Sequence, residues 1–136
     1  MSGFVLDCSV AMGWCFEDEA GPYPDAVLDD LAGTGAVVPS VWPLEVANVL
    51  VTAERRKRIS KAQSRRFLEL LRDLPISVDD ASVARAWDGA LSLAREHDLS
   101  AYDAAYLELA MREGLPIATR DDLLRKAARR CGVPVK

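Results

Sequence analysis

Short runs of apolar, mostly β-branched residues alternate with longer helical segments along this chain, and glycine or proline marks many of the boundaries. The apolar runs lie at 4–6, 36–40, 76–78, 115–119 and 133–135. Helices are expected from about Ser9 and over 21–35, 43–58, 60–75, 79–98, 100–114 and 121–132. Because strands that alternate with helices are typical of parallel sheets, we predict an α/β fold with a central, mainly parallel sheet of about four to five strands.

The length of 136 residues predicts a single domain over 1–136. No run approaches the roughly 20 apolar residues that a membrane helix needs, and no basic leader precedes the first apolar run, so neither a membrane span nor a secretory signal is expected. Cys8, Cys15 and Cys131 show no CxxC spacing. They argue against a zinc site or a disulfide framework and favour a reducing, cytoplasmic compartment.

Charge is distributed unevenly along the chain. Residues 1–54 contain nine acidic residues and no Lys or Arg, whereas the remainder carries all 17 basic residues against 12 acids. Thirteen of the bases fall within 55–66 and 120–136. This pattern indicates a site that needs cations on one side and phosphate on the other, although solvated helix faces would give the same pattern.

Four acidic residues occupy equivalent places relative to the predicted strands and helices. Asp7 and Asp121 each follow a strand, while Glu45 and Asp103 lie in the first turn of a predicted helix. Because the carboxyl ends of parallel strands share one edge of a sheet, these acids are expected to converge there. Taken singly, each also has a local explanation, as a helix cap or as a first-turn acid that complements the helix dipole.

Helical spacing places two of these acids on informative faces. Asp103 shares its face with Leu107, Ala110 and Met111, which points it toward the core, where a bound cation would stabilise it. Glu45 shares its face with a partly polar stripe that could line a groove, formed by Asn48, Val49 and Thr52.

Carboxylates gathered in one crevice repel one another, and a divalent ion offsets that repulsion. Mg²⁺, or Mn²⁺ in its place, prefers oxygen ligands and lowers the pKa of a coordinated water. The single histidine, His97, has polar neighbours and is expected at a solvated helix end, which argues against a zinc hydrolase. Acids for a metal and bases for backbone phosphate together indicate a nuclease.

Three stretches of the chain resemble, in order, the motifs of PIN-domain proteins, specifically VapC-like toxins of prokaryotic toxin–antitoxin pairs: "VLDCSVAMGWCF", "VPSVWPLEVANVL" and "LSAYDAAYLELAMREGLPIATRDDLLRKAARRCGV". The resemblance implies a three-layer α/β/α fold and a Mg²⁺-dependent endoribonuclease. It also implies an acidic quartet of Asp7, Glu45, Asp103 and Asp121, in which Asp7 and Asp103 are the most direct metal ligands. Ser9 and Thr119 match hydroxyl positions that would orient carboxylates or water.

The fourth acid is ambiguous, because Asp121 and Asp122 are adjacent. Asp121 is favoured, since the family pattern places an acid two residues after Thr119 and a leucine three further on, here Leu124. Arg120 stands where relatives commonly have an apolar residue, and it is either a phosphate contact or simply exposed.

Partners follow in part from the resemblance, which implies a homodimer and a cognate antitoxin that packs into an apolar groove. Trp14, Phe16, Trp42 and Leu44 are candidates for that groove, with at least two of them expected in the core. The candidate RNA contacts are Arg55, Arg56, Lys57, Arg58, Lys61, Arg65, Arg66 and Arg120. The competing interpretation is an inactive or housekeeping PIN fold that binds RNA or protein, against which the complete set of four acids argues.

Overall fold

A computed structural model describes residues 3–136, and its centre is a sheet of four parallel strands. The strands are β1 (Phe4–Leu6), β2 (Ala36–Val38), β3 (Ile76–Val78) and β4 (Ile117–Ala118). They lie in the order β3-β2-β1-β4, with β1 paired to β2 on one side and to β4 on the other. The predicted fold class is confirmed, with four strands at the lower end of the expected number.

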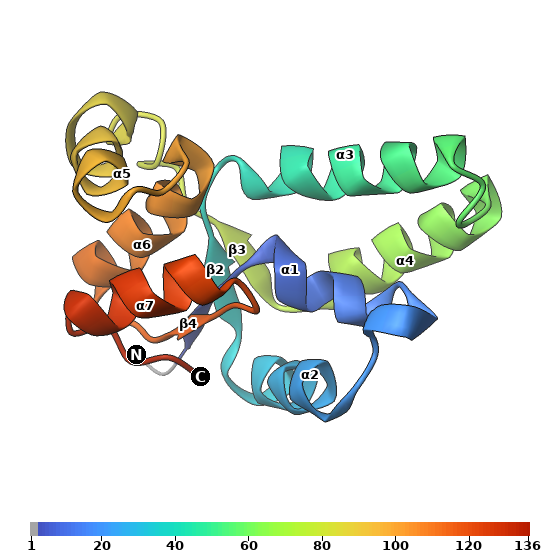
Figure 1. The fold of residues 1–136 in the computed structure, drawn as a ribbon. Coiled ribbons are helices and arrows are strands. Elements are labelled where there is room, and N and C mark those ends of the chain that lie inside the picture. The colour runs from blue at the N-terminus through green and yellow to red at the C-terminus, as the bar shows by residue number, and fades with distance from the viewer. Residues whose placement is uncertain (1–2) are drawn as a thin grey trace.

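Helices cover both faces of the sheet (Figure 1). They are α1 (Cys8–Ala11), α2 (Pro22–Thr34), α3 (Trp42–Arg55), α4 (Lys61–Asp73), α5 (Leu91–His97), α6 (Ala101–Glu113) and α7 (Asp122–Arg130). In Figure 1, α5, α6 and α7 lie to the left of the sheet and α1 to α4 to its right, which gives three α/β/α layers. Within residues 3–136, no helix combines the length and the apolar character needed to cross a membrane.

Local sequence signals explain where several helices begin and end. Ser60 and Gln63 form a reciprocal capping box at the start of α4, and the Ser100 hydroxyl caps α6. Gly35 ends α2 at φ +76°, where an added Cβ would lie 3.2 Å from the Pro75 carbonyl oxygen. A side chain there would be strained both in its backbone and against its neighbour, so glycine is required for the close approach of α2 to the start of β3.

The core lies between the sheet and the two helical layers. Every residue of β1 is buried, as expected for a central parallel strand that is covered on both faces. Helix α6 contributes six buried residues, and three of them, Tyr106, Leu107 and Leu109, are fully inaccessible to solvent. Because α6 carries Asp103 in its first turn, the packing of its later turns against the sheet fixes where that acid lies.

Two sequence expectations differ from the structure. The helix predicted over 79–98 begins only at residue 86, with a π-helical turn, η3 (Ala86–Ala90), that continues into α5, while 80–85 forms turns. The strand expected over 133–135 is reduced to a single parallel bridge between Val135 and Ile117. A helix cannot begin at Asp79, because its backbone N–H donates to the Val38 carbonyl at 2.8 Å and so continues the ladder between β2 and β3.

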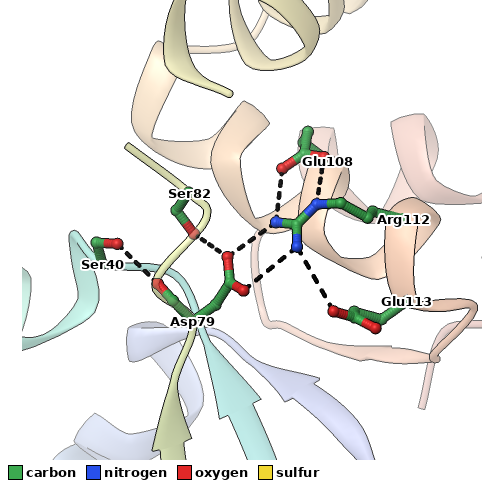
Figure 2. A network of polar contacts seen from close by, with 6 residues as sticks. All are labelled: Ser40, Asp79, Ser82, Glu108, Arg112 and Glu113. Carbon is green, nitrogen blue, oxygen red and sulfur yellow. Dashed lines mark hydrogen bonds and ion pairs between the residues drawn. The ribbon is translucent and has the colours of Figure 1, made fainter. Parts of the chain in front are cut away.

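The Asp79 side chain belongs to a largely buried polar network around Arg112 on α6 (Figure 2). The Arg112 guanidinium donates to Asp79 at 2.8 and 3.2 Å and to Glu108 at 2.9 and 3.0 Å. Ser82 donates to the Asp79 carboxylate at 2.6 Å, and Ser40 donates to the Asp79 carbonyl at 2.8 Å. The network therefore fastens α6 and the loop that leads into α3 to the end of β3.

Candidate active site

The four acids singled out from the sequence line one cleft at the carboxyl edge of the sheet. The cleft has a volume of about 300 Å³ and is lined by Asp7, Cys8, Ser9, Met12, Glu45, Asn48, Val49, Asp103 and Asp121. It lies where the chain order reverses, because β2 and β4 flank β1 on opposite sides. Ligands of open α/β sheets bind at this kind of switch point, outside the carboxyl ends of the strands.

Asp7 is the most buried of the four acids, and hydroxyl groups rather than a capping bond hold its side chain. It is 5% exposed, and the hydroxyls of Ser9 and Thr119 each donate to its Oδ2 atom at 2.7 Å. Each hydroxyl in turn accepts a backbone N–H at 3.1 Å, Ser9 from Arg120 and Thr119 from Asp121. Because an N–H occupies a lone pair of each hydroxyl, the hydroxyl hydrogens are directed at Asp7.

Asp121 serves two purposes at the start of α7. Its Oδ1 atom accepts the Leu124 backbone N–H at 2.9 Å, so it is the helix N-cap, and its side chain also lines the acidic cleft. Asp122 is exposed and is absent from the cleft lining. The cap interpretation and the site interpretation therefore both apply to Asp121, whereas the neighbouring acid faces solvent.

Glu45 and Asp103 come from the first turns of α3 and α6, which meet at the cleft. The Ser100 hydroxyl accepts the Asp103 backbone N–H at 3.1 Å, which leaves the Asp103 carboxylate itself available to the cleft. Glu45 is half-buried, and its Oε1 atom accepts a hydrogen bond of 2.5 Å from the Tyr106 hydroxyl. Of the stripe expected beside Glu45, Asn48 and Val49, one turn along α3, line this wall of the cleft, whereas Thr52 does not.

Burial and mutual repulsion raise the proton affinity of three of these carboxylates. Desolvation raises the pKa of Asp103 to about 6, with further increases from Asp7 and Asp121. Desolvation also raises the pKa of Asp7, against the lowering effect of its two hydroxyl partners. The pKa of Glu45 is raised by desolvation as well, with added repulsion from Asp7 and Asp103. The cleft is thus an anionic site that lacks a compensating positive charge from its own lining.

The donor set of this cleft fits a hard divalent cation. Its charged ligands are all carboxylates, and the one thiol, Cys8, has a pKa raised by burial and so stays neutral. Among residues 3–136, no three His, Cys, Asp or Glu side chains gather closely enough to enclose a metal ion by themselves.

Some of the basic residues predicted to contact RNA are exposed, and others form ion pairs or hydrogen bonds within the chain. Arg55, Arg56 and Lys61 are exposed near the tip of the α3–α4 hairpin, which extends away from the sheet in Figure 1. Arg58, by contrast, pairs with Asp18 at 2.7 Å and Glu19 at 2.8 Å. Because α3 rises about 1.5 Å per residue, Arg55 lies roughly 15 Å along the helix from Glu45.

Arg58 and Arg120 both fasten the 3₁₀ turn η2 (Glu17–Glu19). The Arg58 guanidinium also stacks on the Phe16 ring, 3.8 Å from its centroid. The Arg120 side chain donates to the Glu19 carbonyl at 2.6 Å. Both guanidinium groups therefore have partners within the chain, and a phosphate would have to compete with those partners.

The apolar groove expected from four side chains near the acids is not formed by them. Phe16 and Trp42 are buried in the core, in agreement with the expectation for at least two of the four. Trp14 is half-buried and donates its indole N–H to the Pro24 carbonyl at 2.8 Å, while Leu44 is 72% exposed. The acidic cleft has none of these side chains in its lining.

The fold and the cleft together define an α/β protein with an acidic site at the carboxyl edge of a parallel sheet. A family model of the PIN domain matches residues 4–130, and the chain therefore belongs to the PIN-domain family. PIN domains are generally nucleases, which are hydrolases of phosphodiesters. No curated protein matches the chain.

Two solved structures share this fold. PAE2754 from Pyrobaculum aerophilum has a TM-score of 0.72 at 22% identity, over 98% of this chain and 83% of that one. FitAcB from Neisseria gonorrhoeae has a TM-score of 0.62 at 20% identity, over 97% of this chain and 95% of that one. At these identities the likeness extends to the fold.

Proposed function

We propose that this protein is a metal-dependent endoribonuclease that hydrolyses RNA phosphodiester bonds and acts as the toxin of a toxin–antitoxin pair. The observation that carries the proposal is the convergence of Asp7, Glu45, Asp103 and Asp121 on one cleft. Local capping explains Asp121, but it does not explain why four acids from four separate segments share a site at an energetic cost.

The proposed roles of the residues follow from their surroundings. Asp7 and Asp103 would be the principal ligands of Mg²⁺ or Mn²⁺, with Glu45 and Asp121 completing the site directly or through water. When bound, the cation lowers the pKa of a coordinated water and offsets negative charge on the phosphodiester. Ser9 and Thr119 hold Asp7 in one orientation through its Oδ2 atom.

Hydrolysis requires a water oxygen to bond to phosphorus while the bond to the leaving ribose oxygen breaks. One proton of that water passes to a carboxylate of the cleft, for which Glu45 and Asp121 are the two candidates, and the leaving ribose oxygen takes up a proton from solvent. Asp103, with a pKa near 6 in the metal-free cleft, would release its proton when the cation binds. Cation binding is therefore expected to strengthen as the pH rises through about 6.

The partner part of the proposal rests on the motif resemblance to VapC-like toxins and on the shared fold of FitAcB. We infer a cognate antitoxin as the inhibitor and a homodimer as the assembled form, in a cytoplasmic setting. The alternative of a non-cleaving RNA- or protein-binding module is less well supported, because the cleft retains all four acids.

The proposal is tested by incubating the purified protein with an RNA that contains single-stranded loops, in Mg²⁺, in EDTA, and in EDTA followed by excess Mg²⁺. Cleavage should require the cation and return when it is restored. Asp7→Asn should abolish cleavage, whereas Asp122→Asn, which changes an exposed neighbouring acid, should leave it intact. Full activity of Asp7→Asn, or equal cleavage in EDTA, would contradict the metal-site assignment.

A further inference from the structure

Tyr106 is fully buried in α6, yet its hydroxyl reaches an acid of the cleft. It donates to Glu45 Oε1 at 2.5 Å, and the ring is completely inaccessible to solvent. Tyr106 lies three residues after Asp103, so the two share one face of α6. Its hydrogen bond therefore joins the helix that carries Asp103 to the helix that carries Glu45.

Glu45 is the acid of the cleft whose side chain is held by one hydrogen bond from a distant helix. Asp7 is held by two hydroxyls, and Asp121 by a backbone N–H of its own helix. Among hydrogen bonds between residues 3–136, the one from Tyr106 is the sole bond that the Glu45 side chain accepts. A glutamate has three rotatable side-chain bonds and loses considerable entropy when it is fixed, so a single rigid donor decides whether it stays in the cleft.

We propose that Tyr106 is a positioning residue, which fixes Glu45 through Oε1 and so prepares the cleft to bind a divalent cation. The inference rests on the proposed function of the cleft. The tyrosine ring is locked by the core, and its hydroxyl can therefore hold the carboxylate without moving. Groups that orient metal ligands in this way typically contribute about 10- to 100-fold to metal affinity.

The first test compares Tyr106→Phe, which keeps the ring and removes the hydroxyl, with Tyr102→Phe. Tyr102 is 62% exposed on the same helix and serves as the matched control. In calorimetric titrations of the metal-free proteins with Mn²⁺, the affinity of Tyr106→Phe should fall about 10-fold. The affinity of Tyr102→Phe should equal that of the wild type.

A second comparison separates positioning from a general effect on the fold. In a Glu45→Ala background, Tyr106→Phe should have no further effect on Mn²⁺ affinity, because its partner is already missing. In the metal-free protein, NMR of the Glu45 side chain should show loss of a single rotamer in Tyr106→Phe, with the core signals unchanged.

The inference is overturned if Tyr106→Phe keeps wild-type Mn²⁺ affinity, if Glu45 stays ordered in that variant, or if the loss of affinity persists in the Glu45→Ala background. Failure of the proposed function can be distinguished from failure of this inference, because it would be seen in the wild-type protein itself. If the wild-type protein binds no Mn²⁺, both the proposed cation site and the role of Tyr106 in cation binding are wrong. The NMR measurement of the Glu45 side chain would still show whether the Tyr106 hydrogen bond fixes that side chain.

Discussion

Asp103 illustrates how one carboxylate can serve a site at the expense of stability. Burial and two neighbouring acids raise its pKa from 3.8 to about 6 in the folded protein. Between these values the unfolded chain has lost the proton that the folded chain still holds. The free energy of unfolding of the metal-free protein therefore falls as the pH rises from about 4 to about 6, and the penalty is complete above that range.

Asp103→Asn should remove this penalty. At pH 8 without metal, we expect the variant to be more stable than the wild type by on the order of 1 kcal/mol, measured by urea unfolding. At pH 4 or below the gain should vanish, because the wild-type carboxyl is then protonated in the folded state. The same variant should lose RNA cleavage.

Asp122→Asn is the matched control for stability, since Asp122 is a first-turn acid that faces solvent. It should give no comparable gain at pH 8. An Asp103→Asn protein that is less stable than the wild type at pH 8, or equally stabilised at pH 4, would contradict the repulsion inferred for the cleft.

At the scale of the elements, the position of α6 decides where both Asp103 and Tyr106 lie. The Arg112 network fixes that position against the end of β3 (Figure 2). The side chains of Arg112, Asp79 and Glu108 are only 16%, 12% and 9% exposed. Removing the Arg112 guanidinium would leave the largely buried carboxylates of Asp79 and Glu108 without a positive partner. That loss lowers the free energy of unfolding, because a buried charge is unfavourable without an opposite charge beside it.

Arg112→Met should therefore destabilise the protein by about 3–5 kcal/mol in urea unfolding at pH 7. Arg112 lowers the pKa of Asp79, so the stability from this pair is present above the ordinary aspartate pKa and is lost as the pH falls through the lowered one. Arg85→Met, at an exposed position before η3, should change stability by less than about 0.5 kcal/mol. A destabilisation below about 1 kcal/mol for Arg112→Met would show that the network does not hold α6.

Sequence reasoning predicted the elements that depend on local signals and failed where the structure depends on contacts between distant residues. Strands β1 to β4 and most helices follow from local signals, such as the Ser60 capping box and the glycine at position 35. The turns at 80–85 instead follow a residue whose contacts are distant in sequence, since the Asp79 N–H bonds to Val38 and its carboxylate to Arg112, 33 residues away. No local pattern reveals such an interaction, and the helical appearance of 79–98 was therefore misleading over its first turns.

The acidic site shows the same division. The places of the four acids follow from topology, because strand ends of a parallel sheet meet at one edge. Tyr106 was not predicted as a site residue, since a tyrosine among leucines and alanines on a helix is typical of a core position. Its spacing of three residues from Asp103 was the available signal, but the hydrogen bond to Glu45 depends on how α3 crosses α6.

For the whole molecule, the uneven charge along the sequence places acidic and basic side chains in different parts of the structure. The acids converge at the sheet edge, whereas exposed Arg55 and Arg56 lie at the hairpin tip. Basic side chains that bind RNA phosphates give affinity without sequence preference, and that affinity weakens with salt. If these arginines bind RNA, their removal should reduce the salt dependence of RNA binding and have little effect on the rate of phosphodiester hydrolysis.

RNA binding of an Arg55→Gln, Arg56→Gln double variant, made in the inactive Asp7→Asn protein, tests this arrangement. The slope of log affinity against log salt concentration should become shallower by about 0.7 for each RNA phosphate that the variant no longer neutralises. Arg129→Gln with Arg130→Gln, which removes the same charge from the end of α7, is the control. Equal slopes for the two double variants would remove the hairpin tip from the RNA-binding surface.

The central claim, that four acids converge to hold a catalytic cation, is tested most directly by crystallising the protein with Mn²⁺ and recording anomalous diffraction. We predict an anomalous peak inside the cleft lined by Asp7, Glu45, Asp103 and Asp121, and its disappearance in crystals of Asp7→Asn grown in the same way. A cleft without a peak at saturating Mn²⁺, or a peak that persists unchanged in Asp7→Asn, would contradict this claim.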